Sequence, residues 1–259
     1  MKAQLYSQSG EKKSEIELPE IFSSKIREDL AAKSSEVEKF ELRQPYSSYS
    51  EAGKRHSASG TISHLRHTWK GHYGKGISRV PRKTMWRRGT QFYWVGAEIS
   101  GSRGGRISHP PQGIYSQRKI NKKETKLAFA SAFAATASRR FVLKRYSTLN
   151  ENALPVIPLV IESVPAKTKD FLSVLEKIFG KAYSLVIRNK EVRPGKGKKR
   201  GRKYKSNAGL LLVTAADEKV KCKNIEVKAV KEINIADLYP LGRLTLYTKK
   251  ALEELKDIK

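Results

Sequence analysis

The feature that most constrains this chain is a stretch of 70 residues, 43–112, that is strongly basic and rich in glycine. It holds 13 Lys and Arg residues but only two acids, Glu51 and Glu98, and it contains 10 of the chain's 18 glycines. Long apolar runs are missing from it. Such a stretch cannot bury enough apolar surface to offset the entropy of ordering its backbone. We therefore expect it to lie outside the hydrophobic core and to take its shape against a partner.

Aromatic residues in the same stretch indicate what that partner is. Disordered segments are usually poor in aromatic residues, yet this one has eight, including all three tryptophans of the chain, Trp69, Trp86 and Trp94. Rings and guanidinium planes stack on unpaired bases, Arg binds phosphate with two donors, and glycine lets the backbone approach closely. The whole chain has a formal net charge of +28, which a polyanion would neutralise. This pattern favours a loop that folds onto RNA.

A second basic run, 188–206, is shorter and denser. Its first 18 residues carry ten Lys and Arg and one acid, Glu191. Three glycines, Gly195, Gly197 and Gly201, oppose a stable α-helix there, so we expect a loop. The alternatives are a solvated loop and a localisation signal. Because the run lies between two expected strands, a phosphate-contacting loop inserted in the globular domain is favoured.

The remaining residues, roughly 170, are enough for one hydrophobic core. Hydrophobic periodicity predicts helices over 21–40, 119–138, 168–179 and 234–239 and a last helix capped by Thr248. Strands are predicted over 156–164, 184–188, 210–215, 225–230 and 244–247. Asn121 and Glu124 have the spacing of a capping box. Strands alternating with helices predict an α/β fold: a three-layer α/β/α body with a mostly parallel sheet, formed by 1–42 and 113–259, from which 43–112 emerges as a long extended loop.

Catalytic and metal sites have little support. His64, His67 and His72 are close in sequence, but no Asp, Glu or Cys lies near them to complete a zinc site, so we expect neither a metal nor a cofactor. Contact with RNA or stacking on its bases is the favoured role of these histidines. The basic surface also lacks the paired carboxylates that hydrolysis of RNA would need. The single cysteine, Cys222, is expected to be an ordinary strand or loop residue, with a reactive thiol as the alternative. No apolar run approaches the roughly 18 residues of a membrane helix, so a cytoplasmic protein without a membrane partner is expected.

Several motifs, read together, resemble a known family, the large-subunit ribosomal protein L-four family (the universal protein numbered four). They are 74–82 (Gly-Lys-Gly-Ile-Ser-Arg-Val-Pro-Arg), 101–106 (Gly-Ser-Arg-Gly-Gly-Arg), 109–111 (His-Pro-Pro) and 118–124 (Arg-Lys-Ile-Asn-Lys-Lys-Glu). Residues 195–207, followed by a buried strand, are similar to the archaeal and eukaryotic branch. The chain ends soon after its last expected helix, which favours an archaeal source.

The resemblance implies a structural constituent of the large ribosomal subunit rather than an enzyme. It implies a globular α/β domain on the solvent side, and a loop that passes through the rRNA to the wall of the nascent-peptide exit tunnel and supports assembly. The implied partners are large-subunit rRNA, neighbouring large-subunit proteins and the nascent peptide. Two other classes remain as alternatives: a free RNA-modifying or RNA-cleaving enzyme, and a general chromatin or membrane-surface binder.

Residue type and the motif match together give the expected rRNA contacts. In the loop they are Arg43, Lys54, Arg55, Arg66, Trp69, Lys70, Lys75, Arg79, Arg82, Lys83, Trp86, Arg87, Arg88, Trp94, Arg103, Arg106 and His109. In the second basic run they are Lys196, Lys198, Lys199, Arg200, Arg202 and Lys203. The resemblance implies that the tunnel-facing end lies around 75–88, where the expected residues are Lys75, Arg79, Arg82 and Arg87.

Overall fold

In the computed structural model the described residues are 1–58, 65–68, 71–112, 118–147, 149, 155–218, 220 and 222–257. The chain forms two compact units. Unit 1 consists of Met1–Leu42 and Arg118–Lys259, and unit 2 consists of Arg43–Gln117. The sequence places the change from loop to body at 113, and residues 113–117 lie outside the described part of the chain.

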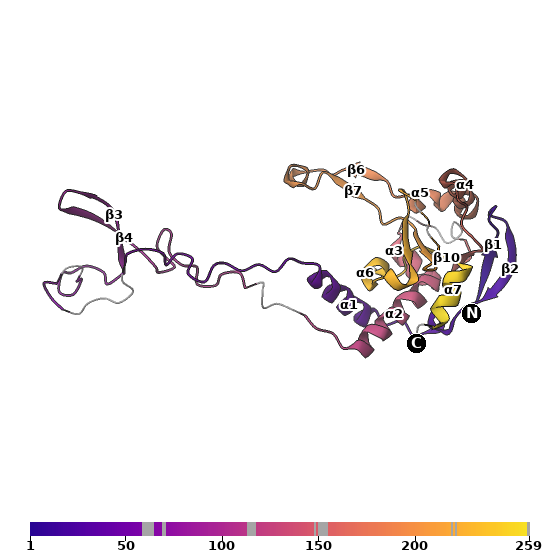
Figure 1. The fold of residues 1–259 in the computed structure, drawn as a ribbon, viewed down its shortest axis with the longest axis horizontal. Coiled ribbons are helices and arrows are strands. Elements are labelled where there is room, and N and C mark those ends of the chain that lie inside the picture. The colour runs from indigo at the N-terminus through magenta and orange to yellow at the C-terminus, as the bar shows by residue number, and fades with distance from the viewer. Residues whose placement is uncertain are drawn as a thin grey trace. The chain divides into compact units, whose positions relative to one another are not determined.

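Unit 1 is a mixed α/β structure built on a six-stranded sheet with the strand order β2-β1-β5-β10-β8-β9 (Figure 1). Within this six-stranded sheet β1 and β2 pair in the antiparallel sense, and all the other neighbouring strands are parallel. The strands are β1 Lys2–Tyr6, β2 Lys12–Glu17, β5 Leu159–Ile161, β8 Leu211–Thr214, β9 Glu226–Ala229 and β10 Thr245–Thr248. The mainly parallel sheet predicted from the sequence is therefore confirmed, and the apolar strand predicted over 210–215 is an internal one.

The helices connect these strands. They are α1 Glu28–Glu41, α2 Lys122–Ala137, α3 Arg139–Arg145, α4 Thr168–Phe179, α5 Tyr183–Val186, α6 Ile235–Leu238 and α7 Lys249–Asp257. Short 3₁₀ turns cover Glu20–Ser23, Gly180–Ala182, Lys196–Arg200 and Val230–Glu232. Outside the six-stranded sheet, β3 (Arg82–Arg88) pairs with β4 (Gln91–Gly96) in unit 2, and β6 (Lys190–Val192) pairs with β7 (Tyr204–Ser206) in unit 1.

Alternate residues of the strands enter two different hydrophobic clusters, as the period of two along a strand requires. In β8, Leu211 and Val213 belong to the first cluster, which also contains Phe133 of α2. Leu212 belongs to the second, with Phe171 of α4. Every residue of β8 is buried, which explains why its sequence is apolar without alternation.

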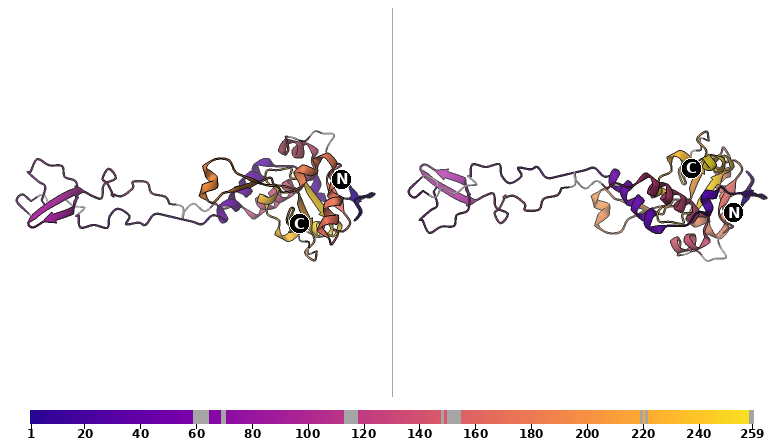
Figure 2. Two further views of the ribbon diagram at one scale, coloured as in Figure 1. Left: turned by 90° about the horizontal axis from the view of Figure 1, so that it is seen from above. Right: turned by 90° about the horizontal axis from the view of Figure 1, so that it is seen from below.

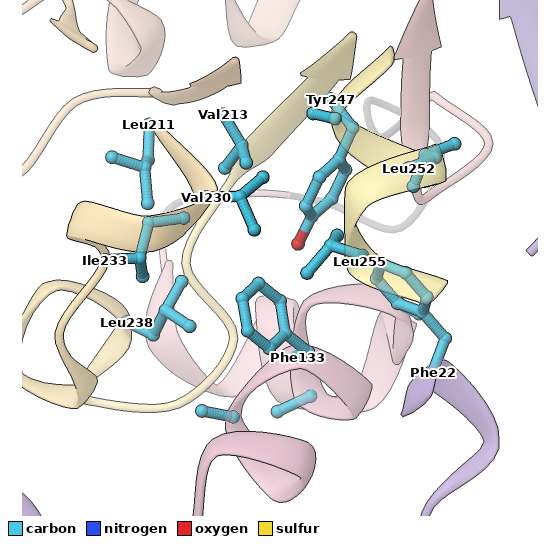
Figure 3. Close-up of a cluster of buried hydrophobic side chains, with 14 of the residues drawn as sticks. Phe22, Phe133, Leu211, Val213, Val230, Ile233, Leu238, Tyr247, Leu252 and Leu255 are labelled. Atoms are coloured by element: carbon cyan, nitrogen blue, oxygen red, sulfur yellow. The ribbon is translucent and has the colours of Figure 1, made fainter. Parts of the chain in front are cut away.

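Tyr247 of β10 is a fully buried polar side chain at the centre of the first cluster. Figure 3 shows its ring pointing toward Phe133. Its hydroxyl lies 2.8 Å from Oγ1 of Thr136, so the phenol group is hydrogen-bonded despite its burial. Burial raises the pKa of Tyr247 to about 12, and the hydrogen bond with Thr136 opposes that shift.

Two of the predicted elements differ from the structure. The strand predicted over 184–188 is wrong, because Tyr183–Val186 forms α5 directly after α4 and a 3₁₀ turn. A short apolar run does not distinguish a strand from a helical turn, and here Val186 is buried in the second cluster from a helical backbone. The helix predicted over 21–40 is a 3₁₀ turn at Glu20–Ser23 followed by α1, which begins only at Glu28.

The predicted helix starts are largely confirmed. Oδ1 of Asn121 accepts a hydrogen bond from the backbone N–H of Lys123 at the start of α2. The predicted capping box is therefore only partial, because Asn121 accepts from Lys123 and not from the backbone of Glu124. The Glu124 carboxylate pairs with Lys33 of α1 at 2.8 Å, which lowers its pKa, and its hydrogen bond with the backbone of Asn121 also contributes to lowering that pKa. Thr248 caps α7, because its Oγ1 accepts a hydrogen bond from the backbone N–H of Ala251.

A buried arginine, Arg243, joins three segments of unit 1. Its Nη2 donates to Oε2 of Glu226 in β9 and to the carbonyl oxygen of Ala208, both at 2.8 Å. Its Nη1 donates to the carbonyl oxygen of Asp237 in α6, also at 2.8 Å. The side chain is only 4% exposed, so these acceptors replace water around the charge. Arg243 therefore ties the segment that follows β7 to the sheet.

Arg243→Ala should lower the free energy of unfolding by about 3–5 kcal/mol, because it leaves the Glu226 carboxylate without its closest partner. Urea unfolding followed by circular dichroism measures the change. As a control, Lys13→Ala breaks an ion pair with Glu162 in which both side chains are about half exposed, and it should change stability little. Equal effects of the two substitutions would contradict the role assigned to Arg243.

Candidate nucleic-acid interface

Unit 2 is organised around the antiparallel hairpin formed by β3 and β4, whose two strands lie side by side in both views of Figure 2. Gly89 and Thr90 join the strands, and Gly89 has a φ of +58°, which a two-residue hairpin turn favours at this position. The register shifts between Thr84 and Trp86, so Met85 has no partner across the hairpin and is 69% exposed. The hairpin gives a rigid support to a segment that the sequence predicts only as a loop.

The hairpin carries aromatic side chains on both faces. The rings of Trp86 and Tyr93 stack across the strands, with centroids 3.8 Å apart and an interplanar angle of 9°. Phe92 and Trp94 alternate with Tyr93 along β4, so they project from the opposite face. Trp86 and Tyr93 are each nearly half exposed in unit 2. Exposed rings held flat are the surfaces on which unpaired bases stack.

The two segments that lead to and from this hairpin lie together within unit 2. Ser47 forms a β-bridge with Gln112, and the backbone N–H of Ser48 donates to the carbonyl oxygen of Pro111 at 3.3 Å. Further along, a Cβ atom at Gly53 would collide with the backbone of Gly105. Gly53 has a φ of +79° as well, so both space and backbone conformation require glycine there.

Among the described residues of unit 2, four arginines lie over tyrosine rings. The guanidinium carbon is between 4.3 Å and 5.7 Å from the ring centroid, within the range of a cation–π interaction. The pairs are Arg43 with Tyr46, Arg55 with Tyr49, and both Arg66 and Arg79 with Tyr73. Because stacking leaves the edge of a guanidinium group accessible, these arginines can still donate to phosphate.

A cavity of about 380 Å³ lies at the base of the hairpin. It is lined by Thr68, Gly71, His72, Lys75, Ile77, Arg82 and Trp94. Nη1 of Arg82 lies 3.2 Å from Nδ1 of His72 and also donates to the carbonyl oxygen of Ser78 at 2.8 Å. Burial lowers the pKa of His72, and the positive charges of Arg82 and Lys75 lower it further.

A second basic surface lies in unit 1, on the hairpin formed by β6 and β7 (Figure 1). Lys196–Arg200 forms a 3₁₀ turn between the strands, in place of the loop expected from the sequence. Asn207 fastens the base of the hairpin: its Oδ1 accepts from the backbone N–H of Asn189, and its Nδ2 donates to the carbonyl oxygen of Ile187. The basic side chains are thus presented from a supported turn.

The structure places most of the expected contact residues at the surface of their units. Trp69 and Lys70 lie outside the described residues; Arg82, Lys83 and Trp94 are half-buried, and all the others are exposed. Lys75, Arg82 and Trp94 come together at the cavity. The sequence did not predict that His72 lines a cavity, and it did not predict the β3–β4 hairpin. The run Phe92-Tyr93-Trp94-Val95 after Gly89-Thr90 was an available signal for that hairpin.

The histidine group considered as a metal site is not assembled in the described part of unit 2. His64 lies outside the described residues, His67 is exposed in a turn, and His72 contacts Arg82. Among the described residues no three side chains of His, Cys, Asp or Glu are grouped in a way that could hold a metal ion. In the same part of the chain, no helix has the length and apolar character needed to cross a membrane.

Residues 16–258, which include both hairpins and the cavity, match the model of the ribosomal protein L4/L1 family. The chain belongs to this family. Its relatives include proteins named large ribosomal subunit protein uL4: that of Nanoarchaeum equitans is 35% identical over 100% of this chain and 99% of the relative. The protein of Thermoplasma volcanium is 38% identical over 99% and 98%, and that of Archaeoglobus fulgidus is 36% identical over 98% of each chain. The resemblance to the L-four family read from the motifs is therefore confirmed, and the relatives named here are archaeal.

The pKa of His72 should lie below the ordinary value of 6.5, and Arg82→Gln should raise it toward that value. Removing the Arg82 charge removes one of the effects that disfavour the protonated ring, while the desolvation remains. An NMR titration of the imidazole carbon-bound protons measures both values. Arg88→Gln, at the far end of β3, removes the same charge away from the ring and should leave the His72 titration unchanged. A His72 that titrates at or above 6.5 in the unaltered chain would contradict the cavity geometry.

Proposed function

We propose that this chain is a structural constituent of the large ribosomal subunit, that it binds large-subunit rRNA and that it supports assembly rather than catalysing a reaction. The observation that carries the proposal is the combination of a family match over 16–258 with a unit whose exposed side chains are cations and stacked rings. The relatives are named as large ribosomal subunit proteins. A cytoplasmic location follows from that assignment.

The two units have different parts in this proposal. Unit 1 is the globular domain, a three-layer α/β/α body, and the two separate hydrophobic clusters fed by alternate strand residues support this arrangement. Unit 2 is the extended loop that passes through the rRNA to the wall of the exit tunnel. Lys75, Arg79, Arg82 and Arg87 are its tunnel-facing residues, beside the nascent peptide. Neighbouring large-subunit proteins are the remaining partners.

Binding is driven by charge neutralisation and by stacking. Each Lys or Arg that pairs with a phosphate releases condensed counterions, which makes the affinity depend strongly on salt. The preformed Trp86–Tyr93 stack adds a flat face, and stacking of one base on an aromatic ring contributes about 1–3 kcal/mol. Because the guanidinium groups over Tyr46, Tyr49 and Tyr73 are already positioned, less side-chain entropy is lost on binding.

A chain in which 45–110 is replaced by a short Gly-Ser linker tests the role of unit 2. The linker can be short, because the backbones of Ser48 and Pro111 are hydrogen-bonded. We expect the variant to keep the circular dichroism and melting behaviour of a folded α/β body, because the hydrophobic clusters lie in unit 1. It should compete poorly with the intact chain for incorporation into large subunits, measured by co-sedimentation through a high-salt wash. Equal incorporation of the two chains would overturn the proposal for the loop.

The basic turn of unit 1 is tested by changing Lys198, Lys199 and Arg200 to Gln. If the three side chains contact phosphates, the slope of log K against log salt should fall in magnitude by about 0.7–0.9 for each lost contact. Filter binding of rRNA at several salt concentrations measures the slope. The matched control changes Lys249, Lys250 and Lys256, which are exposed on α7, to Gln and removes the same charge. A control slope that falls as much as that of the hairpin variant would show only a general charge effect.

A further inference from the structure

We propose that the cavity at the base of the β3–β4 hairpin binds one unpaired nucleotide of the rRNA, with the base beside Trp94 and the phosphate toward Lys75 and Arg82. The inference rests on the proposed function, and it adds a defined subsite to what would otherwise be a diffuse basic surface. It gives the cavity residue His72 a defined place in the contact with RNA.

The size of the cavity fits a ligand of this class. Its volume of about 380 Å³ lies at the lower end of the roughly 300–1,000 Å³ that small-ligand pockets occupy. Trp94 and Ile77 supply an aromatic ring and an aliphatic side chain, as a planar base requires. Thr68 and His72 add polar groups beside them. The lining therefore combines apolar surface with a few hydrogen-bonding groups.

The charge of the cavity selects an anion. Lys75 and Arg82 line it, and none of the described residues that line it is Asp or Glu. The acids of the whole 43–112 stretch are Glu51 and Glu98, and neither belongs to the lining. A neutral aromatic ligand would leave these cations without a counter-charge, whereas a nucleotide brings a base and a phosphate together.

The contact between Arg82 and His72 fixes what the histidine ring can offer. A guanidinium group has donors only, so Nδ1 of His72 must accept the hydrogen bond from Nη1 of Arg82. The ring is then neutral and carries its proton on Nε2. The lowered pKa of His72 agrees with a neutral ring. Nε2–H is thus a donor of fixed identity, suited to a carbonyl or ring-nitrogen acceptor on a base.

The surroundings of the cavity favour a nucleotide that is part of an RNA strand over a free mononucleotide. Arg66 and Arg79 lie on the ring of Tyr73, next in sequence to His72. Nζ of Lys83, next to Arg82, lies close to Gly104. These cations stand outside the lining, where the phosphates before and after an inserted nucleotide would pass. A free mononucleotide would gain only the contacts within the cavity.

The substitution Ile77→Trp in the full-length chain tests the proposal, because it fills the cavity without changing the charge of the protein. Ile77 is 47% exposed, so the larger side chain does not have to enter the core of either unit. The matched control is Ile107→Trp, since Ile107 is also in unit 2, is 67% exposed and does not line the cavity. We expect Ile77→Trp to weaken binding to large-subunit rRNA by about 5- to 150-fold, which corresponds to one stacked base. Ile107→Trp should bind like the unaltered chain.

Chemical probing of the bound rRNA with a reagent that acylates 2′-hydroxyl groups locates the nucleotide. With Ile77→Trp, one unpaired nucleotide should lose its protection while the other protections stay. His72→Phe keeps a ring of similar size but removes the Nε2–H donor, and it should affect the same nucleotide. This second variant keeps the test decisive if Ile77→Trp does not fold. Affinity and protections equal to those of the unaltered chain in both variants would overturn the proposal.

Two further measurements distinguish a failure of the proposed function from a failure of the nucleotide subsite alone. If the unaltered chain binds large-subunit rRNA no better than an unrelated RNA of equal length at matched salt, the proposed function itself fails, and the subsite fails with it. If the unaltered chain is selective but Ile77→Trp matches the control, only the subsite fails. Adenosine, guanosine, cytidine and uridine monophosphates should compete only weakly for the cavity. Competition by one of them at concentrations similar to the rRNA would overturn an rRNA nucleotide as the occupant.

Discussion

The separation of positive charge from apolar surface is the constraint on which the whole molecule depends. Unit 1 holds both hydrophobic clusters, whereas the 43–112 stretch carries a net charge of +11, and its described residues fold around the β3–β4 hairpin and a set of cation–π pairs. Repulsion among those cations opposes compaction. Tyrosine rings, carbonyl oxygens and backbone bridges position the cations without cancelling their charge. The charge thus remains available to a polyanion.

The body could be predicted from sequence because its signals are local and agree with one another. The apolar run at 210–215 has the length of a strand, and the periodic segment at 168–179 has the length of a helix. The structure has β8 and α4 at these places, as expected. The strand predicted over 184–188 was wrong because a run of three apolar residues, 185–187, fits either a strand or a helical turn. Long-range contacts decided that case, since Val186 packs into the second cluster.

The candidate site was predictable in its chemistry but not in its geometry. Counting charges and rings identified the loop and most of its cations, because phosphate and base recognition require those residue types. It did not show that Arg82 lies beside His72, because that contact depends on how the segment before β3 folds back onto the hairpin. A residue such as Thr68 carries no signal of its own in the sequence. Its proximity to Trp94 is a property of the folded unit.

Arg243 has a consequence for genetics. It is buried away from solvent, yet it holds the carbonyl oxygen of Ala208, a few residues after the end of β7. On the proposed function, a screen for alleles that weaken ribosome production would recover Arg243 together with surface lysines of the basic turn. The two kinds of allele would differ under cooling: a packing lesion is rescued at low growth temperature, and the loss of a surface cation is not.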